Sequence, residues 1–127
     1  MKKIAFVLLS ICLSVSFAMA QKNGPAMKFD KTVHDFGKVQ EKAEKVTTEF
    51  TFTNTGKAPL IINRVQTSCG CTTPDYTKEP VLPGKKGSIK VTYSTSGRVY
   101  AFTKKITVFT NVPDSVYTLT IKGEVIN

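Results

Sequence analysis

The sequence predicts an all-β protein, a sandwich of about seven antiparallel strands. Apolar and polar residues alternate with a period of two in four separate runs, and no stretch shows a helical period. These runs are rich in β-branched and aromatic residues, which fit a pleated, half-buried surface. Turn-forming residues separate the runs at intervals of about 8–12 residues, a spacing typical of a sandwich of short strands.

The first half of the expected domain contains three strands. Residues 27–33 are expected to form an opening strand, and residues 46–52 alternate Val, Thr, Phe and Phe with polar residues. Asn54-Thr55-Gly56 closes this second strand, because Asn and Gly tolerate the backbone conformations that tight turns require. Residues 60–62, Leu-Ile-Ile, form a shorter apolar strand.

The second half adds three longer strands. Residues 89–93 follow a turn around Pro83-Gly84, residues 102–108 follow Ser96-Gly97, and residues 117–125 follow the turn at 111–114. In each strand one parity is mainly apolar and the other carries Thr and Lys. One face is therefore expected to pack the core and the other to meet water.

The N-terminus resembles an export signal. Met1-Lys2-Lys3 is a basic start, residues 4–17 are apolar apart from serines, and Ala18-Met19-Ala20 is an A-x-A cleavage site. The apolar run is shorter than the roughly 20 residues of a membrane span, so we expect cleavage and no transmembrane segment afterwards. We predict a signal peptide at residues 1–20, a flexible leader at 21–26 and a single domain at 27–127, located in the periplasm, the cell envelope or outside the cell.

The chain is basic, with a formal net charge of +9. Its lysines are spread along the sequence, which favours a role in solubility over a concentrated anion-binding patch. Nucleic acid is not an expected partner, because the chain is exported and lacks tryptophan or an aromatic-basic repeat on which bases could stack. The expected partner is an unidentified protein or an envelope glycan.

Cys69 and Cys71 are the residues most suggestive of chemistry, since thiols of exported proteins encounter oxidising conditions. Their side chains are too far apart in a flat strand for a disulfide, and we expect Gly70 to permit the bend that joins them. So small a loop would stabilise the fold weakly. The pair is therefore a candidate redox centre, with an inert oxidised pair as the alternative.

Metal binding is a further alternative for the same two cysteines. Two thiolates on one turn suit Cu(I), which accepts few ligands. Structural zinc needs four ligands, and His34 is the one additional strong soft donor in the expected mature chain. Cu(I) is therefore the only cofactor that the sequence suggests; otherwise none is expected.

Catalysis beyond thiol chemistry has little support in the sequence. His34 precedes Asp35, but neighbouring residues of a strand point to opposite faces, so they are not expected to form a dyad. We expect Asp35 and Gly37 to form a turn or bulge and Phe36 to fill the core. No G-x-S-x-G, H-E-x-x-H or P-loop motif is present, and no catalytic residue is predicted.

Several short motifs, in their order along the chain, resemble the domain-of-unknown-function 1573 family. They are His34-Asp35-Phe36-Gly37, Phe52-Thr53-Asn54-Thr55-Gly56, Ser68-Cys69-Gly70-Cys71-Thr72, Pro80, Leu82-Pro83-Gly84, Gly87-Ser88-Ile89, Gly97-Arg98 and Asn111. The resemblance implies an exported, immunoglobulin-like β-sandwich common in Bacteroidota-type bacteria and similar in outline to sperm-protein-like modules. It implies no settled activity. The family often has glycine after Gly97-Arg98, where this chain has Val99-Tyr100.

Two hypotheses of function follow. In the first, the domain is a binding module, more consistent with the sequence than an enzyme, that uses an edge strand or end loops. Its expected contact residues lie in the predicted loop 67–78 and the turn after residue 96: Thr72, Pro74, Tyr76 and Arg98. In the second, Cys69 and Cys71 carry thiol redox chemistry or bind Cu(I).

Overall fold

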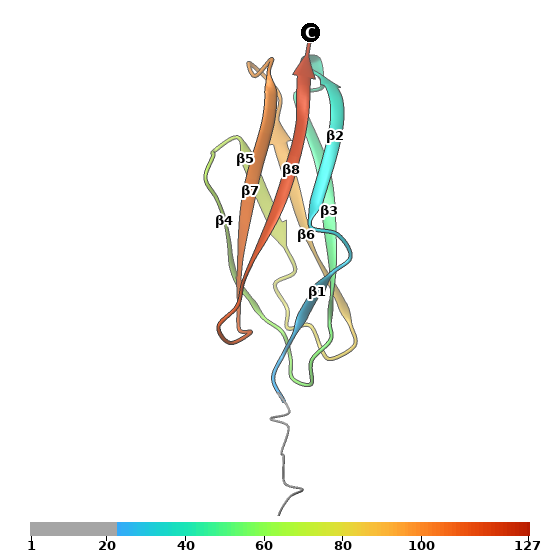
Figure 1. The fold of residues 1–127 in the computed structure, drawn as a ribbon, viewed down its shortest axis with the longest axis vertical. Coiled ribbons are helices and arrows are strands. Elements are labelled where there is room, and N and C mark those ends of the chain that lie inside the picture. The colour runs from blue at the N-terminus through green and yellow to red at the C-terminus, as the bar shows by residue number, and fades with distance from the viewer. Residues whose placement is uncertain (1–22) are drawn as a thin grey trace, which may run out of the picture.

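The computed structural model describes residues 23–127 as a sandwich of two four-stranded sheets (Figure 1). The strands are β1 (Met27–Phe29), β2 (Val33–Gln40), β3 (Lys45–Asn54), β4 (Ile62–Thr67), β5 (Thr72–Tyr76), β6 (Lys86–Ser94), β7 (Ala101–Thr110) and β8 (Val116–Ile126). A short 3-10 helix, η2 (Glu41–Ala43), joins β2 to β3. The predicted all-β, immunoglobulin-like sandwich is confirmed, while the expected signal peptide at residues 1–20 lies outside the described residues.

The two sheets have the strand orders β1-β3-β6-β5 and β2-β8-β7-β4. Most neighbours are antiparallel, as expected, but β2 pairs with β8 in parallel. The run predicted as one strand at residues 27–33 divides between the sheets. β1 pairs with β3 and ends at Phe29, and the chain then crosses to the opposite sheet, where β2 begins at Val33.

Two other strands differ from their predicted extent. Leu60 forms an isolated bridge with Val81, and β4 starts at Ile62 and continues through polar residues to Thr67. The predicted loop 67–78 contains β5, which pairs with β6 along its whole length. Both strands lie at sheet edges, where the sequence carries no clean apolar alternation.

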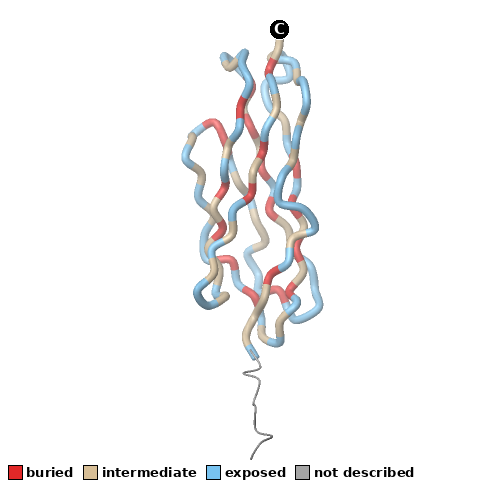
Figure 2. The backbone as a smooth tube through the Cα atoms, viewed as in Figure 1, coloured by how far each residue is buried: buried red, intermediate tan, exposed pale blue. Residues whose placement is uncertain are grey.

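The core lies between the sheets, where buried positions alternate along the strands (Figure 2). Phe50 and Phe52 of β3 point inward, as their parity predicted. Phe52 faces Gly87 on β6, and a Cβ at position 87 would lie 2.5 Å from the Phe52 ring, so the aromatic side chain requires glycine there. Tyr93 of β6 stacks on Phe102 of β7 with ring centroids 3.9 Å apart, joining the two sheets.

Asn54, at the end of β3, is fully buried and ties three segments together. Its Oδ1 accepts hydrogen bonds from the N–H groups of Ala26 at 3.3 Å and Gly56 at 2.9 Å. Its Nδ2 donates to the carbonyls of Ala58 at 2.7 Å and Val81 at 2.8 Å. Because a buried amide needs all of its partners, Asn54 fixes this end of the sandwich.

The described part of the expected leader is bonded to the same end of the sandwich. Thr55 N–H donates to the carbonyl of Ala26 at 3.0 Å, and Lys57 N–H donates to that of Gly24 at 2.9 Å. Over residues 23–127, no helix has the length and apolar character needed to cross a membrane.

Candidate functional site

The Cys-Gly-Cys segment forms the turn between β4 and β5, where the chain passes from one sheet to the other. Cys69 and Cys71 are joined by a disulfide, with their Cα atoms 5.1 Å apart. Of the states that the sequence left open, the structure therefore has the oxidised pair.

Hydrogen bonds hold this turn independently of the sulfurs. Thr72 N–H donates to the carbonyl of Cys69 at 3.1 Å, and Ser94 N–H of β6 donates to that of Cys71 at 2.9 Å. The Thr67 hydroxyl lies 3.2 Å from the carbonyls of both Cys69 and Thr72. The turn thus has backbone partners on each side of the disulfide, so its shape does not depend on the S–S bond alone.

The two cysteines have different surroundings. Cys71 belongs to the hydrophobic core and is only 4% exposed, whereas Cys69 is half-buried and packs against the edge of that core. The Cys71 N–H donates to Sγ of Cys69 at 3.1 Å, and the Thr72 hydroxyl lies 3.6 Å from Sγ of Cys71. Each sulfur therefore has one polar group beside it.

The backbone at Gly70 shows no feature that requires glycine. Its φ is not in the left-handed region, and a Cβ built at position 70 would lie within 4 Å of no atom outside its neighbours Cys69 and Cys71. The hydrogen bonds described above hold the turn, and the expected role of Gly70 in bringing the two sulfurs together stays a prediction.

A small hollow of about 210 Å³ adjoins the turn. It lies between the turn, the start of β3 and the exposed side of β5 and β6, and its lining residues are Glu44, Lys45, Gly70, Cys71, Thr73, Thr92 and Ser94. The lining thus combines one acidic and one basic residue with Cys71 of the disulfide.

The 95–100 loop, which connects β6 of one sheet to β7 of the other, is tightly held and occupies the same end of the sandwich (Figure 1). Gly97 has a φ of 73°, and its N–H donates to Oε2 of Glu41 at 2.8 Å. Thr95 is buried, with its hydroxyl donating to the Glu41 carbonyl at 3.0 Å. These bonds hold Val99 and Tyr100 at 44% and 51% exposure. We did not predict either as a contact residue, although two large apolar residues directly after a turn are a usable signal.

Beneath the 95–100 loop, Tyr93 is completely buried, and its hydroxyl has no hydrogen-bond partner among the described residues. Burial raises the pKa of Tyr93 and the neighbouring Tyr100 raises it further, while the Arg98 charge opposes the change. Tyr93 therefore remains a neutral phenol that acts through packing.

The four predicted contact residues are placed unequally. Thr72, Pro74 and Tyr76 share the inward-facing parity of β5; Thr72 is 4% exposed and the other two are half-buried. The outward positions of β5 belong to Thr73 and Asp75. Arg98, by contrast, lies half-exposed in the 95–100 loop, where its Nη1 donates to the Ser96 carbonyl at 3.0 Å. The period of two in β5 turns the first three away from solvent.

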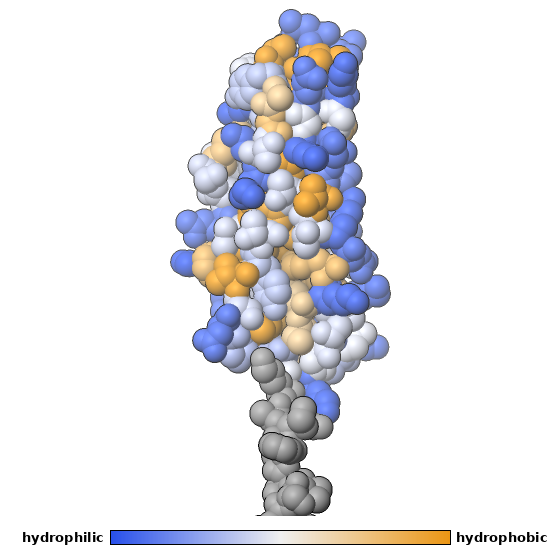
Figure 3. All heavy atoms as spheres, viewed as in Figure 1, coloured by the Kyte–Doolittle hydropathy of each residue, from blue (hydrophilic) through white to orange (hydrophobic). Residues whose placement is uncertain are grey.

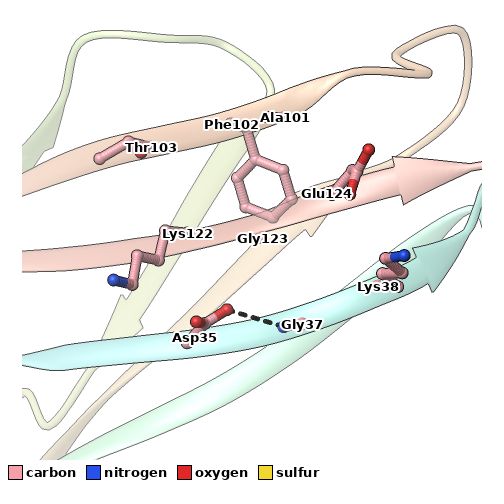
Figure 4. A pocket seen from close by; sticks show the side chains of 9 residues that line it. All are labelled: Asp35, Gly37, Lys38, Ala101, Phe102, Thr103, Lys122, Gly123 and Glu124. Carbon is pink, nitrogen blue, oxygen red and sulfur yellow. Dashed lines mark hydrogen bonds between the residues drawn. The ribbon is translucent and has the colours of Figure 1, made fainter.

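The predicted bulge in β2 is confirmed. The register with β8 shifts between Asp35 and Lys38, Gly37 has a φ of 68°, and its N–H donates to Oδ1 of Asp35 at 2.8 Å (Figure 4). A shallow hollow of about 340 Å³ opens over this bulge, with Phe102 at its floor. Its acidic and basic side chains are mixed and its one bonded carboxylate supports the bulge, so it has no catalytic arrangement.

His34 does not join the cysteines. Lys31 Nζ lies 2.9 Å from its Nδ1, and burial, followed by the Lys31 charge, lowers the pKa of His34 while Asp35 opposes the change. Among residues 23–127, no group of three or more His, Cys, Asp or Glu side chains is placed to hold a metal ion. The Cys69–Cys71 pair would offer two thiolates to Cu(I) only after reduction, so copper binding stays a prediction.

Removal of the disulfide is expected to cost little stability. For the variant Cys69→Ser with Cys71→Ala, we expect the free energy of unfolding to fall by about 1–2 kcal/mol, because a loop of this size constrains the unfolded chain weakly. Alanine at position 71 avoids placing a hydroxyl in the core. Urea denaturation measures the change, and a loss above about 3 kcal/mol would identify the bond as a structural staple.

The two sheets and the oxidised turn that joins them define an immunoglobulin-like β-sandwich domain with a Cys-Gly-Cys disulfide at one end. The chain belongs to the family described as protein of unknown function (DUF1573), whose model matches residues 27–125. This agrees with the resemblance seen in the sequence motifs.

Solved structures with a similar fold differ widely in what they do. A protein of unknown function from Porphyromonas gingivalis W83 matches with a TM-score of 0.70 and 18% identity, over 84% of this chain and 50% of that one. The VesB protease of Vibrio cholerae matches with a TM-score of 0.60 and 15% identity, over 81% of this chain and 32% of that one. WR4, a C. elegans MSP family member, matches with a TM-score of 0.50 and 10% identity, over 78% and 96%.

At these identities the likeness shows the fold alone. This chain spans half the length of the P. gingivalis protein and a smaller part of the protease. No curated protein matches the sequence.

Proposed function

We propose that this chain is an exported, non-enzymatic binding module that holds a protein of the cell envelope through the 95–100 loop. The export signal predicted from residues 1–20 supports the location. The observation that carries the proposal is the exposure of Val99 and Tyr100, two large side chains on a loop that is bonded to Glu41.

The edge strands favour end loops over strand addition as the route of binding. β1 has three residues, and β2 and β4 each carry a register shift. In β5, the bonds from Thr77 N–H to Ser88 and from Ser94 N–H to Cys71 set the alternation, so Pro74 turns its backbone nitrogen to the open edge. Proline has no N–H to donate there. Short length, bulges and proline are the devices that prevent edge pairing.

The 95–100 loop has the composition of a contact surface. Tyr and Arg are enriched at protein interfaces and among the residues that contribute most to binding energy, and Tyr100 and Arg98 flank Val99. Because the loop is already bonded in place, binding would order few additional groups. Figure 3 shows hydrophobic side chains at this end of the molecule among hydrophilic neighbours. The mix of aliphatic, aromatic and guanidinium groups suits a protein better than a glycan.

Site-specific photo-crosslinking in the producing cells tests this proposal. A photoreactive residue at position 99 or 100 is expected to give a discrete protein adduct, while one at Val116, which is 58% exposed, serves as the matched control. Tyr100→Ser should abolish the adduct formed from position 99 and leave the melting temperature unchanged. Equal adducts from positions 99 and 116, or adducts to glycan alone, would contradict the proposal.

A further inference from the structure

We propose that the Cys69–Cys71 disulfide is chemically active in the folded protein and oxidises an external dithiol, which attacks Sγ of Cys69 and expels Cys71 as the thiolate. This activity goes beyond the binding function proposed above and does not depend on it. It rests on the unequal surroundings of the two sulfurs and on a turn that other bonds hold.

The direction of attack follows from burial. An incoming thiolate must reach a sulfur in line with the S–S bond, and Cys71 is 4% exposed within the core, whereas Cys69 is half-buried. Gly70 presents no side chain between the two cysteines, and beyond these two neighbours no atom lies within 4 Å of the place that a Cβ would take. An external thiol therefore has access to Cys69 first.

The polar groups at the turn suit the charges that this reaction creates. The departing Cys71 thiolate has the Thr72 hydroxyl at 3.6 Å, and Lys45 lines the hollow next to Cys71. When Cys69 becomes a thiolate in turn, the Cys71 N–H already points at its sulfur from 3.1 Å. Hydrogen bonds to a thiolate favour the charged form and so assist its departure.

The reaction balances as two exchanges. A dithiol thiolate forms a bond to Sγ of Cys69, the Cys69–Cys71 bond breaks, and its electron pair leaves with Cys71. The second thiolate of the dithiol then attacks the other dithiol sulfur, the one bonded to Sγ of Cys69 in the mixed disulfide, and releases Cys69 as a thiolate. The dithiol becomes a disulfide, the protein pair gains two electrons, and both new thiolates can take up the protons that the dithiol lost.

The fold allows this exchange without unfolding. The bonds from Thr72 and Ser94 to the carbonyls of Cys69 and Cys71 join backbone atoms only, so reduction of the sulfurs breaks neither of them. Cys71 remains in the core in either state because its burial comes from its position next to β5. The reduced protein therefore retains the same turn.

The direction of attack is tested by trapping the mixed disulfide with glutathione as the thiol. The protein is treated under native conditions, quenched with acid and alkylated, and the modified cysteine is located by tandem mass spectrometry. We expect about tenfold more glutathione on Cys69 than on Cys71, and a ratio near one for the protein unfolded in urea. Equal modification of the folded protein, or modification mainly on Cys71, overturns the proposal.

The role of Thr72 is tested by the rate of reduction with dithiothreitol, a dithiol. Thr72→Val is expected to slow reduction roughly three- to tenfold, because the leaving thiolate loses a hydroxyl donor. Thr73→Val is the matched control, since the Thr73 hydroxyl has no hydrogen bond to either sulfur in the described part of the chain. Circular dichroism confirms that both variants are folded, and equal rates for the two variants contradict the assignment.

Discussion

Replacement of Phe52 by alanine is expected to lower the free energy of unfolding by about 3–5 kcal/mol, the usual cost of truncating a buried aromatic residue. Phe52 is 0% exposed, packs edge-on against Phe29 at 5.8 Å and fills the space that Gly87 leaves on the facing strand. Urea denaturation measures the effect as a shift in midpoint at constant slope.

Val116→Ala provides the matched control for this prediction. Val116 is 58% exposed, so its truncation should change the free energy of unfolding by no more than about 0.5 kcal/mol. A loss below about 1 kcal/mol for Phe52→Ala would mean that β3 does not direct Phe52 into the core.

Asn54→Ala is expected to destabilise the fold by about 2–4 kcal/mol. The truncation removes every partner that the buried Asn54 amide supplies, including the one for the Val81 carbonyl, whose hydrogen bond is fully buried. The Val81 carbonyl keeps the bond from Leu60 N–H at 2.9 Å but loses its second donor, which water replaces less readily at a buried site than at the groups nearer the surface. Thermal and urea unfolding both measure the loss.

Asn111→Ala tests the explanation, because it removes a similar pattern of bonds at the surface. Asn111 Oδ1 accepts from Ile61 N–H at 2.8 Å and its Nδ2 donates to the Pro59 carbonyl at 3.0 Å, with the side chain exposed. Solvent can replace these bonds, so we expect a cost of about 1 kcal/mol or less. Equal losses for the two variants would show that burial is not the cause at Asn54.

The strands with regular alternation were predicted correctly from sequence, namely β3, β6, β7 and β8. These strands form the centres of the two sheets, where one face is mostly buried and the alternation with a period of two is regular. The turns around Gly84 and Gly97 were also predicted correctly. Both glycines have a positive φ, a conformation that glycine adopts readily.

The edge strands could not be predicted in the same way. The bulge at Gly37 shifts the parity of β2 in mid-strand, and β2 pairs in parallel with a strand at the far end of the sequence. β5 is short and contains Pro74, a residue that signals a loop unless it lies on an open edge. A strand that satisfies only one neighbour needs less apolar character, so its sequence carries less information.

The candidate site shows a similar division. The proximity of Cys69 and Cys71 could be predicted from their spacing, but their unequal burial depends on the strand that starts at Thr72. Since that segment was predicted as a loop, Thr72 was expected at the surface. In the structure, Thr72 is buried. Val99 and Tyr100 depart from the family pattern in the sequence. Their exposure depends on the anchoring of the 95–100 loop to Glu41, which only the structure shows.

The urea dependence of the rate of reduction by dithiothreitol tests most directly whether the disulfide reacts within the folded domain. If it does, the rate constant stays nearly constant across urea concentrations below the unfolding transition, because no global opening precedes the reaction. A rate constant that rises exponentially with urea, with the slope measured for equilibrium unfolding, would show that the bond reacts only in the unfolded chain and would contradict the account.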